Sequence, residues 1–209
     1  MDKIFTKNIE HESAVKHVTG KAIYTDDISE PKNLLHAVIG YSNCSKGVIK
    51  KIDYKDVLSS EGVVDIITEK DIEGINDVGP IFKGDKIFTS KNIEYYGQPI
   101  FAVIAKTNNL AKKAALKVKI DLKISKPIVS IEEALKKKSF VLKPKHLTRG
   151  NIKDGFKKSD NILKGKLYSG GQDHFYLEGQ IAMTIPQEDN NFLVYSSTQH
   201  PSETCLLYT

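Results

Sequence analysis

The sequence predicts an α+β fold, in which a mixed module comes first and a β-rich segment follows it. Through the first two thirds of the chain, apolar runs of strand length alternate with stretches of helical spacing. Beyond residue 160, strand-like runs follow one another with only turn residues between them. A chain of 209 residues with 40% hydrophobic and 27% charged residues is long and apolar enough to bury a core.

The strands expected in the mixed module are short apolar or β-branched runs, at 33–42, 47–54, 63–67, 100–106 and 118–124. The run 100–106 is continuously apolar up to its final lysine, which is typical of a strand with neighbours on both sides, so we place it centrally. Between the strands, Asp53 is expected to cap a helical turn, and Thr68 with Asp71 to begin a short helix. Residues 107–118 are expected to form a longer helix, because they set an apolar stripe beside lysines.

A connector is predicted at 126–150, between a first domain at 12–125 and a second at 151–209. Ser130 and Glu133 form a capping-box pattern before a short helix, and prolines and a glycine turn follow.

The second domain begins with a short helical piece at 152–160. Strands are then expected at 161–170, 180–185 and 191–198, with a hairpin loop at 186–191. No partner elements follow these strands, and bare strand edges are a liability, so we expect this domain to be incomplete as given.

The composition argues against several classes of function. Lysines are scattered among acids and Arg149 is the only arginine, a pattern that does not favour nucleic-acid binding. Cys44 and Cys205 are the only cysteines, too few for a disulfide framework or a Cys-ligated cluster. Neither a signal peptide nor a membrane span is recognisable, so the expected location is the cytoplasm.

The segment GGQDHFYLEG at 170–179 concentrates chemistry-bearing side chains. In a strand, Gln172, His174 and Tyr176 would share one face. A zinc site would need further ligands, for which His200 is the nearby candidate, whereas His174 satisfied by a neighbouring carboxylate is the plainer alternative. The double glycine suggests a bulge or a close backbone approach.

The segment SSTQHPSE at 196–203 ends an apolar strand in a polar turn. The Gln199 amide offers two donors and an acceptor, which suits a polar ligand in a pocket at a strand end. The alternative is a turn whose side chains only satisfy backbone groups. The same choice exists at Gln98, where Gly97 and Pro99 favour a tight turn entering a strand. Neither a serine nucleophile elbow nor a glycine-rich phosphate loop is present.

These segments, in this order and spacing, resemble the aldehyde oxidase/xanthine dehydrogenase family, in particular the molybdenum-binding subunits of its xanthine dehydrogenase branch. The matching stretches are HVTGKAIYTDDI (17–28), EYYGQPIFAVIA (94–105), GGQDHFYLEGQ (170–180) and SSTQHPSE (196–203).

The resemblance implies an α/β hammerhead domain followed by the first β-rich part of a molybdopterin-binding domain. It also implies hydroxylation of a purine, hypoxanthine or xanthine, with water-derived oxygen at a molybdenum–pterin centre. Gln199 matches the family's glutamine beside the molybdenum oxo group, so it is the expected cofactor-binding and metal-facing residue. An iron–sulfur ([2Fe–2S]) and FAD subunit is the implied partner, which makes a hetero-oligomer.

Two departures from the family pattern qualify these expectations. The family's glycine-rich segment with the catalytic glutamate would follow Gln199, so this chain offers no catalytic residue and is expected to be inactive alone. Its ending SETCLLYT also departs from the family, which suggests a truncation or frame change. The alternatives are a non-catalytic docking module for an iron–sulfur/flavin partner and an aldehyde-oxidising relative.

Overall fold

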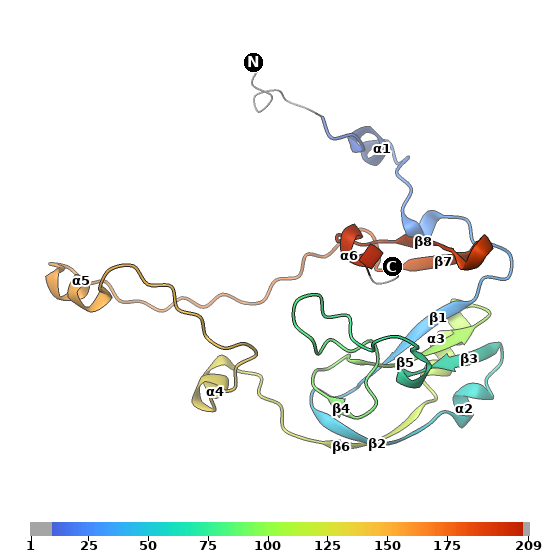
Figure 1. Ribbon diagram of the computed structural model, residues 1–209, viewed down its shortest axis with the longest axis horizontal. Helices are drawn as coiled ribbons and strands as arrows, with labels where there is room; N and C mark the ends of the chain where they lie inside the picture. The colour runs from blue at the N-terminus through green and yellow to red at the C-terminus, as the bar shows by residue number, and fades with distance from the viewer. Residues whose placement is uncertain (1–9, 207–209) are drawn as a thin grey trace.

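The computed structural model describes residues 10–206 (Figure 1). Two three-stranded antiparallel sheets make up the body of the first domain. One has the order β1-β5-β3, from His36–Tyr41, Pro99–Ala105 and Val63–Ile67, and the other the order β4-β2-β6, from Asn92–Ile93, Gly47–Asp53 and Lys119–Ile124. The predicted central position of the apolar strand is confirmed, because β5 pairs on both edges. The two-residue strand β4 was not predicted.

The core of this domain forms where β5 meets helix α3 (Asn108–Ala115). Phe101 and Val103 of β5 and Ala111 of α3 have no exposed surface. The Thr107 side chain accepts a hydrogen bond from the Leu110 N–H (3.2 Å) and so begins the helix. The helix ends at Ala115, so its predicted extension to residue 118 is wrong. The chain leaves the helical path there because β6 starts at residue 119 and pairs with β2.

Two predicted caps have different outcomes. Thr68 and Asp71 form the expected capping box at the short 3₁₀ helix η3 (Glu69–Asp71). Helix α2 (Lys55–Leu58), by contrast, has Tyr54 and not Asp53 at its N-cap position. Asp53 instead lies one residue earlier and accepts a hydrogen bond from the Lys55 N–H at 3.0 Å, so it serves a turn.

The turn that leads into β5 is held by a buried hydrogen-bond network around Ser42 and Gln98. The Gln98 side-chain carbonyl accepts from the Glu94 N–H (2.8 Å), and the Gln98 N–H donates to the Ser42 hydroxyl (3.1 Å). Gly97 has a φ of +80°, in the region that favours glycine. Gln98 is only 4% exposed and its side chain bonds to the turn itself, so the expectation of a tight turn is confirmed.

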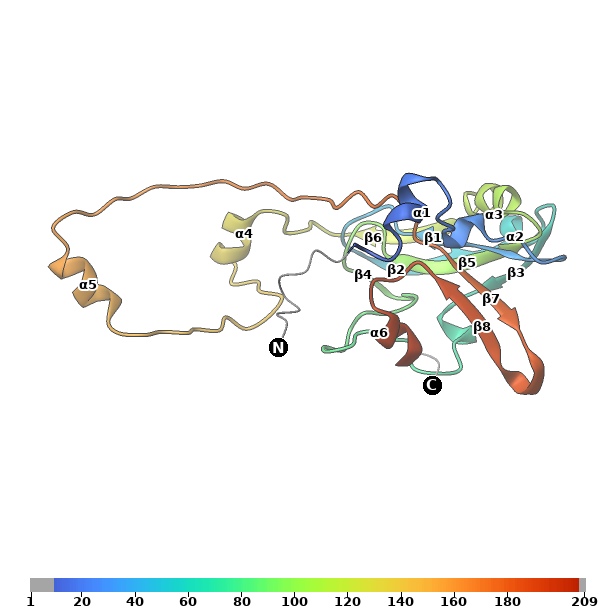
Figure 2. The same ribbon diagram turned by 90° about the horizontal axis from the view of Figure 1, so that it is seen from above.

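The segment after β6 projects from the body as a long arm that carries α4 (Ile131–Lys136) and α5 (Ile152–Lys158) (Figure 2). Ser130 caps α4 by accepting from the Glu133 N–H, but the Glu133 carboxylate pairs with Lys137 (2.7 Å) and does not complete the predicted box. The strand predicted at 161–170 is absent. Its side chains alternate suitably, but no described segment lies beside it to pair with its backbone groups.

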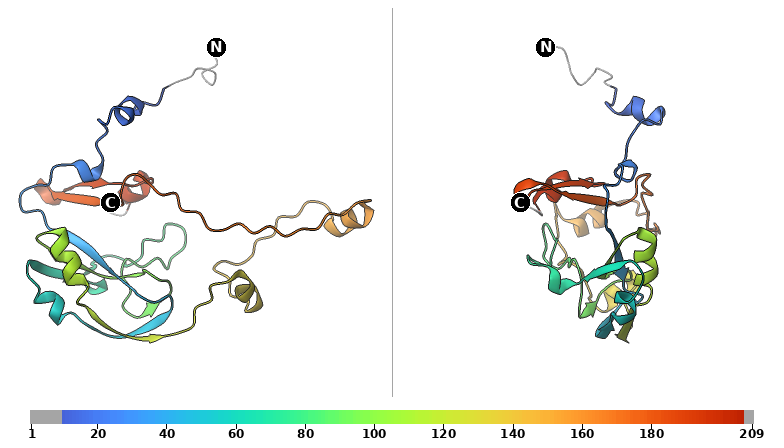
Figure 3. Two further views of the ribbon diagram at one scale, coloured as in Figure 1. Left: turned by 180° about the vertical axis from the view of Figure 1, so that it is seen from behind. Right: turned by 90° about the vertical axis from the view of Figure 1, so that its right-hand side faces the viewer.

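The chain then returns to the body and forms the predicted hairpin, from β7 (Ala182–Pro186) and β8 (Phe192–Ser196) (Figure 3). The 3₁₀ helix η4 (Glu188–Asn190) turns the hairpin, and α6 (Pro201–Leu206) follows it. An N-terminal segment with α1 (Ala14–Val18) and the 3₁₀ helix η2 (Thr25–Asp27) precedes β1; its η2 part lies beside the hairpin, whereas α1 projects away from it. None of the helices described between residues 10 and 206 is both long and apolar enough to span a membrane.

Candidate functional site

Gln199 lies at the open end of the hairpin, beside a cavity of about 830 Å³. A cavity of this size is typical of small-molecule and cofactor sites. Its walls come from a loop of the first domain and from the hairpin with the start of α6. The lining residues are Asp77, Val78, Gly79, Pro80, Lys83, Gln180, Ile181, Ala182, Ser196, Ser197, Thr198, Gln199, His200, Glu203 and Thr204.

The first wall is a loop that its own side chains hold in shape. The Asp77 carboxylate accepts hydrogen bonds from the Gly79 N–H (2.9 Å) and the Gly84 N–H (2.6 Å). These two backbone donors, with that of Gly79 first, hold the pKa of Asp77 below its usual value. The Asn76 side-chain amide donates to the Phe88 carbonyl (2.7 Å) and accepts from the Phe88 N–H (3.0 Å). The loop therefore presents Lys83 to the cavity from a fixed base.

The second wall is the end of the hairpin opposite its loop, where hydrogen bonds between Ser197 and Ile181 hold the two chain segments together. The Ser197 N–H donates to the Ile181 carbonyl (3.0 Å), and the Ile181 N–H donates to the Ser197 hydroxyl (2.8 Å). Thr198 accepts from the His200 N–H at 3.0 Å, so the plain turn interpretation holds for Thr198. The Gln199 side chain is different, because it is exposed and makes no hydrogen bond within residues 10–206.

A smaller cavity of about 300 Å³ joins the two segments that the sequence singles out. Tyr176, Leu177, Glu178 and Gln180 line it from the first segment, and Ser197, Thr198 and Gln199 from the second. Gln199 thus borders both cavities. The fold brings residues 176–180 to the Gln199 turn.

The 170–179 segment forms no strand, so the shared face considered for Gln172, His174 and Tyr176 does not arise. The close backbone approach suggested by the double glycine is wrong, because a Cβ atom at Gly170 or Gly171 would meet no atom within 4 Å. The His174 ring stacks on Tyr176, with centroids 5.6 Å apart and planes 1° from parallel, and no hydrogen bond or ion pair joins it to a carboxylate among the described residues. No cluster of three His, Cys, Asp or Glu suited to a metal occurs among the described residues. His200, the other candidate ligand, has its Nδ1 atom 4.0 Å from Oε2 of Glu203.

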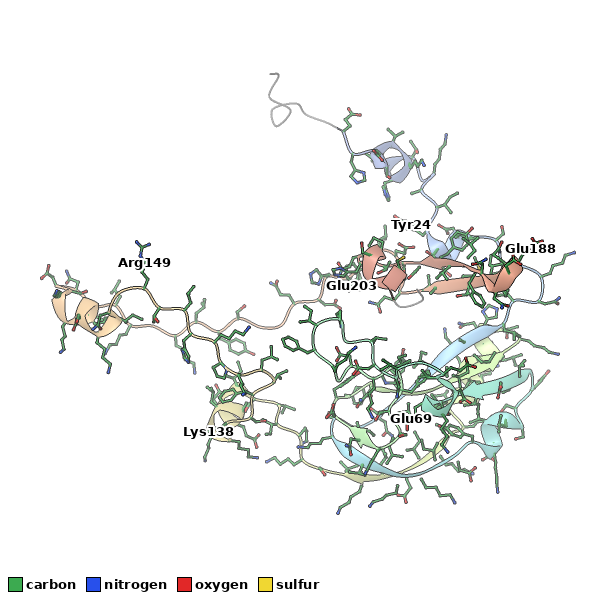
Figure 4. All side chains as sticks on the ribbon, in the orientation of Figure 1. Tyr24, Glu69, Lys138, Arg149, Glu188 and Glu203 are labelled. Carbon is green, nitrogen blue, oxygen red and sulfur yellow. The ribbon has the colours of Figure 1, made fainter. Side chains whose placement is uncertain are left out.

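Glu178 is the residue that sequence reasoning missed. Its carboxylate accepts a hydrogen bond from the Thr25 N–H at 2.9 Å, across 153 positions of sequence. Thr25 opens η2, where Asp27 accepts the preceding Tyr24 N–H at 3.0 Å in a capping box. Figure 4 places Tyr24 at this turn, next to the hairpin. The tyrosine–acid pattern at 24–27 signals a helix start, but not the distant carboxylate that completes it.

Two family models match the chain. The model described as "Aldehyde oxidase and xanthine dehydrogenase, a/b hammerhead domain" matches residues 19–126. The model described as "Molybdopterin cofactor-binding domain" matches residues 133–208. The first covers more than half of the chain.

Curated relatives include a xanthine dehydrogenase of Dictyostelium discoideum, 38% identical over 95% of this chain and 14% of its own length. An aldehyde oxidase 2 of Rattus norvegicus is also 38% identical, over 93% of this chain and 14% of its own length. The chain thus spans about a seventh of these relatives.

Solved structures give the same fold. The aldehyde oxidoreductase of Desulfovibrio gigas superposes with a TM-score of 0.76 at 27% identity, over 90% of this chain and 23% of that one. The quinoline 2-oxidoreductase of Pseudomonas putida 86 reaches a TM-score of 0.79 over 95% of this chain and 27% of that one. At 18% identity it shows the fold alone.

Proposed function

Because the chain belongs to the aldehyde oxidase and xanthine dehydrogenase family, we propose that it forms part of a molybdenum hydroxylase acting on a purine such as hypoxanthine or xanthine. Its fold is a hammerhead domain followed by part of a molybdopterin-binding domain. The observation that carries the proposal is the unengaged Gln199 amide, which borders the cavity between the two parts.

The cavity residues fit a pterin–molybdenum group. When bound, that group supplies the redox chemistry, and the oxygen comes from water. Gln199 has no partner within residues 10–206, so both N–H donors and its carbonyl are available to a ligand. An uncharged amide can orient a polar ligand beside the metal without adding charge or a proton. Lys83, on the opposite wall, adds a cation for a phosphate or other anionic group.

An aldehyde is the second candidate substrate. The rat aldehyde oxidase 2 is as similar to this chain as the amoebal xanthine dehydrogenase, at 38% identity each. Parallel turnover assays with xanthine and with an aldehyde distinguish the two candidates, because the substrate that is turned over identifies the class.

We further propose that a [2Fe–2S] and FAD subunit takes up the electrons, in a cytoplasmic hetero-oligomer. The domain limits that we propose are 12–125 and 151–209, with a connector at 126–150. Support for additional protein contacts comes from the arm, where Val141, Leu147 and Leu163 are fully exposed. Exposed apolar side chains in such numbers mark surfaces that other protein covers. A docking module for the same partner is the non-catalytic alternative.

The test compares Gln199→Ala with Gln187→Ala in the holoenzyme that contains this sequence. Gln187 is a matched amide on the same hairpin, at its far loop, where it contacts only neighbouring carbonyls. We expect Gln199→Ala to lower turnover of xanthine or of an aldehyde by about 10- to 100-fold, as for other groups that orient a metal site. Gln187→Ala should change nothing.

Molybdenum and pterin content, measured on the same preparations, provides a readout besides activity. If the wild-type protein, purified with its partners, contains no molybdenum, the docking module is favoured. A Gln199→Ala variant with unchanged turnover would show that this amide does not face the cofactor.

A further inference from the structure

We propose that Glu178 is a positioning residue, which fixes the Gln199 end of the hairpin to the N-terminal turn at Thr25. The idea rests on the proposed function of Gln199. The Glu178 carboxylate binds a backbone N–H of the chain itself, and it acts on Gln199 through the backbone around it.

Within residues 10–206, the Thr25 N–H has no acceptor other than the Glu178 carboxylate. Thr25 is the first residue of η2, and the first N–H groups of a helix have no partner inside the helix. The Asp27 carboxylate takes the neighbouring Tyr24 N–H, which leaves the Thr25 N–H to Glu178. An ionised acceptor makes this bond stronger than a neutral one.

This bond also stands alone between two parts of the chain. Within the described residues, it is the only hydrogen bond that joins 10–126 to 170–204, and no ion pair joins these ranges. Elsewhere, η2 and the loop after it face β7 across a cavity of about 490 Å³ that both sides line. Directional control over the hairpin therefore comes from one carboxylate.

A short path leads from this bond to the Gln199 turn. Glu178 lines the smaller cavity together with Gln199. Three residues beyond it, the Ile181 backbone exchanges hydrogen bonds with the N–H and the hydroxyl of Ser197, which lies two residues before Gln199. A shift of residues 178–181 is thus passed to the turn, and a displacement of about 1 Å at a reacting site can cost 100-fold in rate.

The experiment uses three variants of the holoenzyme. Glu178→Ala removes the acceptor, whereas Glu178→Gln keeps a side-chain carbonyl of the same length. Glu188→Ala is the matched control, a carboxylate in η4 at the opposite end of the same hairpin (Figure 4). Hydrogen–deuterium exchange of the peptide with Thr25, and kcat and KM, are measured for each.

We expect Glu178→Ala to speed exchange at the Thr25 N–H by about tenfold or more, because a bond to a charged group is lost. It should also lower kcat with little change in KM, since only the orientation of the Gln199 turn is disturbed. Glu178→Gln should restore both most of the way. Glu188→Ala should resemble the wild type in both measurements.

Unchanged exchange at Thr25 in Glu178→Ala would show that the Glu178 carboxylate does not bind the Thr25 N–H, and it would overturn the proposal. Faster exchange with normal kcat would also overturn it, because the bond would then not position the site. If Gln199→Ala still loses activity in that case, the proposed function stands without Glu178. If neither variant loses activity, the proposed function of Gln199 fails as well.

Discussion

Replacing Gly40 with alanine would place a methyl group in space that the Phe101 ring occupies. The two residues face each other across β1 and β5. A Cβ atom at residue 40 would lie 2.2 Å from Cζ and 2.3 Å from Cε1 of Phe101, where ordinary contacts begin at 3.4 Å. Phe101 is fully buried, and Tyr54 meets its ring edge-on at a centroid distance of 5.2 Å. The ring must therefore shift by about 1 Å against a filled core.

Overpacking of this kind costs about 1–3 kcal/mol. The first domain has about 100 residues, for which each kcal/mol lowers Tm by about 4–8 °C. We therefore expect Gly40→Ala to lower Tm by at least about 4 °C. Near-ultraviolet circular dichroism can follow the transition through tyrosine and phenylalanine, because the chain has no tryptophan.

Two further variants make this prediction specific. Gly155→Ala makes the same chemical change in α5, where a Cβ atom meets nothing within 4 Å, and should leave the transition of the sheets unchanged. Phe101→Leu vacates part of the ring's space, so its combination with Gly40→Ala should destabilise less than the sum of the two single changes. Full additivity, or an unchanged Tm in Gly40→Ala, would refute the packing argument.

Two more predictions concern polar groups of the first domain. Burial, and secondly the Asp71 carboxylate, raises the pKa of Tyr54 to about 12 from 10.0, so the folded state holds this proton more tightly. The resulting stability is complete below pH 10 and is lost as the pH rises through 12. The unfolding midpoint of the wild type should therefore fall over this pH range relative to that of Tyr54→Phe, which has no phenol to ionise, and a constant difference between the two would contradict this. Ser42→Ala should cost about 1–3 kcal/mol in urea unfolding, because it leaves the buried Gln98 N–H without its acceptor; an unchanged midpoint would contradict this.

Much of the first domain could be predicted because its elements follow local rules. The run at 100–105 has no polar face, as expected of β5 with sheet neighbours on both edges. The Thr68 cap depends on residues three positions apart. Rules of this kind fail where a distant partner decides the outcome. The 161–170 stretch has the residues of a strand, but pairing needs a neighbour that no local pattern supplies.

The candidate site shows the same limit. Gln199 could be proposed from its place at a strand end and from the family resemblance. The opposite wall could not, because Asp77 and Lys83 lie more than a hundred residues earlier in the chain. Their stretch has the glycine, asparagine and aspartate content of a loop, which predicts a turn but not its position. The Glu178 bond to Thr25 spans 153 positions and was equally hidden.

The two walls of the cavity are held by different means, and this difference decides how each responds to change. Asp77 and Asn76 fix the loop through bonds to their own neighbourhood, so its shape does not depend on the hairpin. The hairpin is regular within itself, but one hydrogen bond from Glu178 directs it toward the first domain. A substitution in the loop should therefore alter the shape of one wall, whereas a substitution at Glu178 should alter the distance between the walls. Because a bound group would contact both walls, the spacing that Glu178 controls matters for binding through its hydrogen bond to the Thr25 N–H.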